Sequence, residues 1–300
     1  MQHSSLFPAL AAALLMPLAA AADEVTINTA LGEATVESSP ATIAVFDIAA
    51  IDTLDALGVQ IDGVPGPIYL ERLTPVAEAA VQVGSLFEPD YEALANLTPD
   101  LIIAGGRSAA VVPDLGRIAP VIDMTIGGDL VADARARTLA YGAIFGLEDR
   151  AEALVADLDA RIAEVAATVE GRGNALIVLT NGGQVSAYGV GSRFGWIHEA
   201  LGLPEAVPGV ETRTHGEAIS FEFIAEANPD WLIVVDRGAA VGQEGESARA
   251  TLDNPLVTGT TAWSAGQVIQ VDPAEIYISG GGYGAIMRVA DQIGAAFAGE

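Results

Sequence analysis

Residues 92–107 read EALANLTPDLIIAGGR, and residues 222–237 repeat the same pattern as EFIAEANPDWLIVVDR, 130 positions further along the chain. Each copy contains an amphipathic helical segment, a Pro-Asp turn, a short apolar strand and an arginine where that strand ends. A helix-turn-strand unit that occurs twice indicates two lobes built to one plan. Ligands of open α/β sheets bind outside the carboxyl ends of the strands, so Arg107 and Arg237 are predicted to line one anion-binding cleft from both sides.

Strands and helices alternate on both sides of the first copy. Residues 42–46 are predicted to form a short apolar strand, and residues 47–57 a helix that Gly58 ends. A similar strand over residues 175–180 opens the second half of the chain. This alternation predicts an α/β protein with mainly parallel sheets.

A long amphipathic helix is predicted between the two halves. Residues 148–170 carry apolar side chains at helical spacing, and Gly171 and Gly173 follow them. We therefore expect an N-terminal lobe over residues 23–145, a connecting helix over 146–171 and a C-terminal lobe over 172–300. The alternative is an ordinary surface helix that belongs to one lobe.

The first residues have the character of an export signal. Residues 6–22 are apolar and rich in alanine, and they end in three alanines before Asp23, which predicts a signal peptide over residues 1–22. The alternative is a buried first helix. The chain has no cysteine, so we expect neither a lipid anchor nor a disulfide. No later stretch has the continuous apolar length of a membrane-spanning helix.

The charge of the chain limits its partners. The formal net charge is −27, and all 13 basic residues are arginine. Such acidity opposes binding to nucleic acid or to an anionic membrane. A small anionic ligand remains compatible with it, because arginines gathered in a cleft act within a screening length of about 8 to 10 Å.

Several enzyme classes lack their required residues. Without lysine there is no P-loop, and without cysteine there is no thiol nucleophile or thiolate metal site. The G-x-G-x-x-G, H-E-x-x-H and G-x-S-x-G patterns are also missing. Residues 193–201 are predicted to form a helix, and His198 is expected to be a packing or surface residue of that helix. The chain is therefore predicted not to be an enzyme; the alternative from that class is an exported hydrolase that uses His215.

Short motifs in a fixed order carry a resemblance that covers residues 40–297. They are VGSLFEPDYE at 83–92, GGRSA at 105–109, YGVGSRFGWIH at 188–198, THG at 214–216, SFE at 220–222, DRGAA at 236–240 and YISGGG at 277–282. Together they resemble the periplasmic ferric-siderophore-binding proteins of ABC importers, and within these the catecholate and petrobactin binders.

The resemblance implies a fold and a function. The fold would have two Rossmann-like lobes joined by one long α-helix, with the ligand cleft between them. The protein would be a periplasmic monomer without an intrinsic cofactor that captures an Fe(III)-siderophore and delivers it to an ABC permease in the inner membrane. Haem or cobalamin binding on the same fold is the alternative within transport.

The resemblance also assigns a basic clamp to Arg107, Arg193 and Arg237. A ferric catecholate is anionic, and arginine offers a planar, permanently charged fork of donors for its oxygens. For any single arginine, the alternative is a surface ion pair of little energetic value.

Iron coordination is assigned by the same resemblance to His215 and Tyr277. Two catechols supply four oxygens, and a phenolate and an imidazole are suitable ligands for the two remaining positions of ferric iron. A loop histidine held by the backbone and an aromatic wall of the cleft are the alternatives. A hexadentate siderophore would leave neither residue a coordination position.

Docking to the permease is assigned to Glu92 and Glu222, one acidic residue on each lobe. Their equivalent places in the repeat suit a partner with pseudo-two-fold symmetry. Glu88 is a rival in the first lobe. The alternative role for both residues is a carboxylate favoured at a helix N-terminus by the helix dipole.

Overall fold

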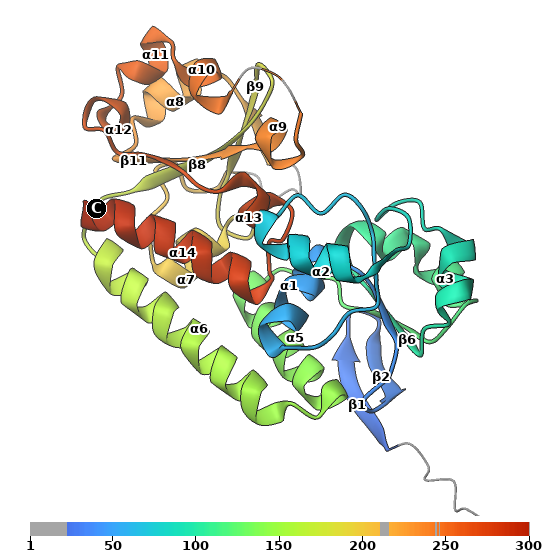
Figure 1. Cartoon of the computed structure of the whole chain (residues 1–300). Coiled ribbons are helices and arrows are strands. Elements are labelled where there is room, and N and C mark those ends of the chain that lie inside the picture. Colours follow the sequence, from blue (N-terminus) through green and yellow to red (C-terminus); the bar gives the residue numbers. More distant parts are fainter. Residues whose placement is uncertain (1–22, 211–215, 244, 246, 300) are drawn as a thin grey trace, which may run out of the picture.

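Each copy of the repeat supplies one inner strand of its own five-stranded sheet and the helix that precedes this strand (Figure 1). The structure is a computed structural model that describes residues 23–210, 216–243, 245 and 247–299. The first copy forms α3 (Tyr91–Leu97) and β6 (Leu101–Ala104), and the second forms α8 (Phe221–Ala227) and β11 (Trp231–Asp236).

The Pro-Asp turns have a common structural role. Both helices end on a residue with positive φ directly before the proline, Thr98 in one copy and Asn228 in the other. Asp100 then accepts backbone hydrogen bonds from residues 41 and 42, and Asp230 accepts one from Asn174. Each aspartate therefore ties the start of its own strand to the start of the neighbouring central strand.

The sheet of the N-terminal lobe is entirely parallel, in the order β5-β4-β3-β6-β7. Its other strands are β3 (Ile43–Phe46), β4 (Gly63–Val64), β5 (Val81–Gln82) and β7 (Val121–Asp123). A separate antiparallel hairpin, β1 (Glu24–Thr29) and β2 (Gly32–Glu37), precedes this sheet.

The sheet of the C-terminal lobe is mixed, in the order β10-β9-β8-β11-β12. Strands β8 (Ala175–Asn181), β11 and β12 (Val268–Gln270) are parallel. Strands β9 (Gln184–Tyr188) and β10 (Glu217–Ile219) are antiparallel to their neighbours. The hairpin between β8 and β9 turns at Gly182, whose φ of 58° favours glycine. The predicted mainly parallel character therefore describes the first lobe fully and the second in part.

Helices cover both sheets. In the N-terminal half they are α1 (Ile48–Leu57), η1 (Glu71–Leu73), α2 (Thr74–Ala79), η2 (Gly106–Val111), α4 (Val112–Leu115) and α5 (Leu130–Phe145). In the C-terminal half they are α7 (Trp196–Leu201), α9 (Arg237–Ala240), α10 (Ala248–Leu252), α11 (Pro255–Thr258), α12 (Thr261–Ser264), α13 (Pro273–Tyr277) and α14 (Tyr283–Ala298).

The long helix α6 (Glu148–Val169) packs into the cores of both lobes and lies beside α14 (Figure 1). Its first buried residues, Ala151 and Leu154, belong to the core of the N-terminal lobe. From Leu158 onward its buried residues belong to the core of the C-terminal lobe. One rigid element thus joins the two lobes. In the described part of the chain, no helix combines the length and apolar character needed to cross a bilayer.

Candidate functional site

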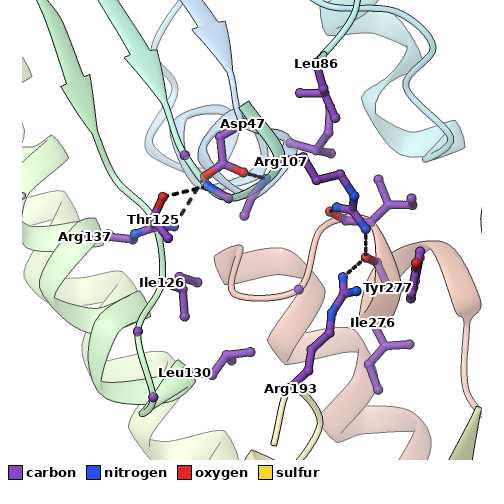
Figure 2. A pocket seen from close by; sticks show the side chains of 18 of the residues that line it. Asp47, Leu86, Arg107, Thr125, Ile126, Leu130, Arg137, Arg193, Ile276 and Tyr277 are labelled. Atoms are coloured by element: carbon purple, nitrogen blue, oxygen red, sulfur yellow. Dashed lines mark hydrogen bonds and ion pairs between the residues drawn. The ribbon is translucent and has the colours of Figure 1, made fainter. Parts of the chain in front are cut away.

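A cleft of about 570 Å³ lies between the two lobes, at the carboxyl ends of the parallel strands (Figure 2). The N-terminal lobe lines it with the start of α1, the loops after β6 and β7, and α5. The C-terminal lobe lines it with the turn before α7 and with the end of α13 and the residues that follow it. Of the two strand-end arginines, Arg107 lines this cleft and Arg237 does not.

Arg107 and Arg193 reach into this cleft from opposite lobes and meet at Tyr277. Arg107 Nη2 donates to the backbone oxygen of Tyr277 at 2.7 Å, and Arg193 Nη2 donates to the same oxygen (Figure 2). The Arg193 guanidinium lies 4.2 Å from the centre of the Tyr277 ring, and that of Arg107 lies 5.1 Å from it. Two cations from different lobes therefore share one aromatic residue.

Arg237 contacts the cleft through the phenol of Tyr277. Its Nε donates to Tyr277 Oη at 3.3 Å, and its Nη1 donates to Asn181 Oδ1 at 3.2 Å. Burial by itself raises the pKa of the Tyr277 phenol, but the hydrogen bond from Arg237 and the charges of the three arginines outweigh burial and lower it. The Tyr277 phenol therefore loses its proton more readily than an ordinary tyrosine, and the phenolate is the form that binds a metal ion.

The three arginines carry charge that the described residues do not neutralise. Within that part of the chain, none of the three forms an ion pair with a carboxylate; each donates only to carbonyl, phenol or amide oxygens. Burial, and next the nearby charge of Arg107, lowers the pKa of Arg193. Partly buried positive charge without a counter-ion favours an anionic ligand.

The structure brings four of the five predicted ligand residues together: Arg107, Arg193, Arg237 and Tyr277. His215 lies outside the described residues, as does the predicted signal peptide over residues 1–22. The prediction that a helix starts at Arg193 is wrong, because α7 begins only at Trp196. Gly195 packs against the backbone of Gly189 in a tight turn, and that turn directs Arg193 into the cleft.

Glu92 and Glu222 lie in the first turns of α3 and α8 and are exposed. Neither lines the cleft. A side-chain hydrogen bond with Ser220 lowers the pKa of Glu222. Glu88 is also exposed, in the loop before α3. His198 is buried, with Nδ1 2.8 Å from the backbone oxygen of Leu203, so of the two expected roles, packing or surface, it has the packing role.

Sequence reasoning missed part of the cleft wall in the N-terminal lobe. Asp47 follows β3 and Thr125 follows β7, so the rule that ligands bind at strand ends would have found both. Arg137 lies in the middle of α5, where no sequence pattern distinguishes it from a surface arginine. The apolar wall residues Leu86, Ile126 and Leu130 likewise carry no local signal.

A family described as periplasmic binding protein matches residues 43–275. The chain belongs to this family. The petrobactin-binding protein YclQ of Bacillus subtilis is 35% identical over 265 residues, which cover 86% of this chain and 83% of YclQ. The ferric-anguibactin-binding protein FatB of Vibrio anguillarum is 32% identical over 90% of this chain and 86% of its own length.

Solved structures agree with this membership. The crystal structure of YclQ superposes with a TM-score of 0.86 at 32% identity, covering 92% of this chain and 99% of YclQ. The periplasmic catecholate-siderophore binding protein VctP of Vibrio cholerae superposes with a TM-score of 0.84 at 30% identity, covering 93% and 100%. The predicted fold is thereby confirmed, and the family places this binding protein outside the enzymes.

Proposed function

We propose that this binding protein captures an anionic ferric siderophore of the catecholate type in the cleft and delivers it to an ABC permease. The convergence of Arg107, Arg193 and Arg237 on Tyr277 carries this proposal. Ferric catecholates present several negatively charged oxygens, and each can accept charge-assisted hydrogen bonds from a guanidinium group. Relatives at 30 to 35% identity that are named for petrobactin and for catecholate siderophores support the same ligand class.

Tyr277 and His215 are proposed as iron ligands for a tetradentate siderophore. The lowered pKa of the Tyr277 phenol supports this role, because phenolate oxygen is a hard donor that suits ferric iron. For a hexadentate siderophore, Tyr277 would instead contribute only to the wall of the cleft. A haem or corrin ligand presents fewer anionic oxygens to three clustered guanidinium groups than a ferric catecholate does.

The organisation of the chain follows from the same proposal. Residues 1–22 would direct export and be removed, which would leave a periplasmic monomer. Residues 23–145 and 172–300 would form the two lobes, with 146–171 as the connecting helix. The contribution of α6 to both cores supports this division and favours small movements between the lobes on binding.

Ligand preference is the direct test of the proposed function. We expect ferric bis-catecholate complexes to bind at least about tenfold more tightly than ferric hydroxamates of lower negative charge. One additional charge-assisted hydrogen bond is enough to account for a factor of about ten. Quenching of tryptophan fluorescence would report binding, because Trp196 is buried and follows Arg193 closely in the sequence. Equal or tighter binding of the hydroxamate would contradict the assigned ligand class.

Glu92 and Glu222 are proposed to dock the protein to the permease. Their role in docking can be tested separately from siderophore binding. Replacing both by alanine should leave the dissociation constant of the ferric siderophore within about twofold and reduce its uptake by cells, since neither residue lines the cleft. Glu152→Ala on the exposed face of α6 is a control whose change of charge matches that of either single replacement. Loss of ligand affinity in the double variant, or unchanged uptake, would remove the docking role.

A further inference from the structure

Arg137 is a buried cation in the wall of the cleft, away from the arginines around Tyr277. It belongs to α5 and is only 7% exposed, yet it lines the same cavity as Arg107 and Arg193. Figure 2 shows its guanidinium group beside Asp47 and Thr125, with Ile126 and Leu130 nearby and Arg193 and Tyr277 on the other side of the cleft. The cavity therefore has a guanidinium group beside a carboxylate on one side, the arginines at Tyr277 on the other, and apolar side chains between them.

The hydrogen bonding of Arg137 is incomplete. Its Nη1 lies 3.5 Å from Asp47 Oδ2, longer than the roughly 2.7 to 2.9 Å of a well-formed charge-assisted bond. Its Nη2 is buried and has no hydrogen-bond partner in the described part of the chain. A buried guanidinium group with unused donors is costly unless another group completes its bonding.

Asp47 offsets only part of the charge of Arg137. Its Oδ1 accepts a hydrogen bond from Ala49 at 3.1 Å and caps the N-terminus of α1. The helix dipole stabilises the carboxylate there, so Asp47 is engaged by the helix as well as by Arg137. Thr125, the neighbouring polar side chain of the wall, accepts from Gly106 and donates to Asp123, so it does not serve Arg137.

We propose that Arg137 is a second recognition point of the cleft and binds a carboxylate of the siderophore that is distant from the catecholate groups at Tyr277. This inference rests on the proposed function. A small rotation of the guanidinium group would exchange its long contact with Asp47 for a charge-assisted bond to the ligand oxygen. Arg107, Arg193 and Arg237 would then supply general affinity for ferric catecholates, and Arg137 would select among them by the chemistry of the linker.

The test begins with the unaltered protein and two ligands. Two ferric bis-catecholate complexes are compared that differ only in the linker, one with a pendant carboxylate and one with the matching carboxamide. We expect the carboxylate complex to bind roughly tenfold more tightly. Equal binding of both overturns this inference and leaves the proposed function standing, whereas binding of neither overturns both.

Variants then assign the preference to Arg137. In Arg137→Gln the ratio of the two dissociation constants should fall to about one. Asp47→Asn keeps an N-cap for α1 and frees the guanidinium group, so the ratio should rise. Thermal unfolding of each variant shows whether it is folded. A ratio that stays tenfold in Arg137→Gln, or that falls in Asp47→Asn, overturns the assignment.

Discussion

Replacing Arg72 by methionine is expected to lower the free energy of unfolding by about 3 to 5 kcal/mol, because it leaves the buried Asp52 without a counter-ion and leaves Glu275 with only a 3.5 Å ion pair to Arg288. Arg72 Nη1 lies 2.5 Å from Asp52 Oδ1, and its Nε and Nη2 lie 2.7 and 2.6 Å from the two oxygens of Glu275. The side chains of Asp52 and Glu275 are only 1% and 7% exposed. Methionine keeps the length of the stem but removes all three charged contacts.

This cluster joins the lobes directly behind the cleft. Asp52 and Arg72 belong to α1 and η1 of the N-terminal lobe, whereas Glu275 belongs to α13, two residues before Tyr277. Asp52 Oδ2 also accepts the backbone N–H of Ala285 in α14 at 2.8 Å. The same substitution should therefore weaken ferric-siderophore binding as well as stability, since it releases the segment that carries Tyr277.

Denaturant unfolding at two pH values would measure the effect. Arg117→Met is the control, because Arg117 is 80% exposed and its ion pair with Asp114 should contribute less than about 1 kcal/mol. Burial raises the pKa of Asp52, and Arg72 offsets only part of that rise.

The pH dependence of the Arg72→Met deficit has a definite sign. Without Arg72 the pKa of Asp52 rises further above its unfolded value, so the folded variant gains stability as the pH falls and Asp52 takes up a proton. The stability deficit should therefore be larger at about pH 8 than at about pH 5. A deficit below about 1 kcal/mol at both pH values would show that the cluster is not a stabilising link.

The sequence was sufficient to predict the repeated unit, because its signals are local. The prolines, the aspartates that follow them and the apolar strands fix each helix-turn-strand segment within 16 residues. The rule for strand ends then predicted that Arg107 and Arg237 line one cleft, of which Arg107 alone lies in the cleft wall. The helical periodicity of residues 148–170 predicted α6 to within one residue, because a long helix with one apolar face has an unambiguous pattern.

Contacts between distant segments could not be predicted in the same way. Arg72 and Glu275 are 203 residues apart, and neither carries a local signal for a buried ion pair. Arg193 was expected within a helix, and only the packing of Gly195 against Gly189 shows why the chain turns there instead. Strands β9 and β10 pair antiparallel with their neighbours. The sequences of such short strands specify neither the direction nor the register of their pairing.

Replacing Arg107 and Arg193 together by glutamine is expected to weaken binding of a ferric bis-catecholate by about a hundredfold to ten-thousandfold. Each charge-assisted hydrogen bond contributes about 1.5 to 3 kcal/mol, so each single variant should lose about tenfold to a hundredfold. Both guanidinium groups bond to the backbone oxygen of Tyr277, so one can take over part of the other's role and the two losses need not add. Titration of tryptophan fluorescence would give all three dissociation constants.

Stability distinguishes a ligand-binding role for Arg193 from a structural one. Burial and the charge of Arg107 both lower the pKa of Arg193, so its positive charge is disfavoured in the protein without ligand. Arg193→Gln should accordingly unfold at the same denaturant concentration as the unaltered protein or at a higher one. Arg249 is an exposed arginine that lies over the ring of Trp263. Arg249→Gln makes the same change in net charge away from the cleft, so it should leave the affinity for the ferric siderophore within about twofold. Unchanged affinity of the double variant, or strong destabilisation of Arg193→Gln, would contradict the ligand-binding role. These arginines would then stabilise the fold, and other residues of the cleft would have to bind the ligand.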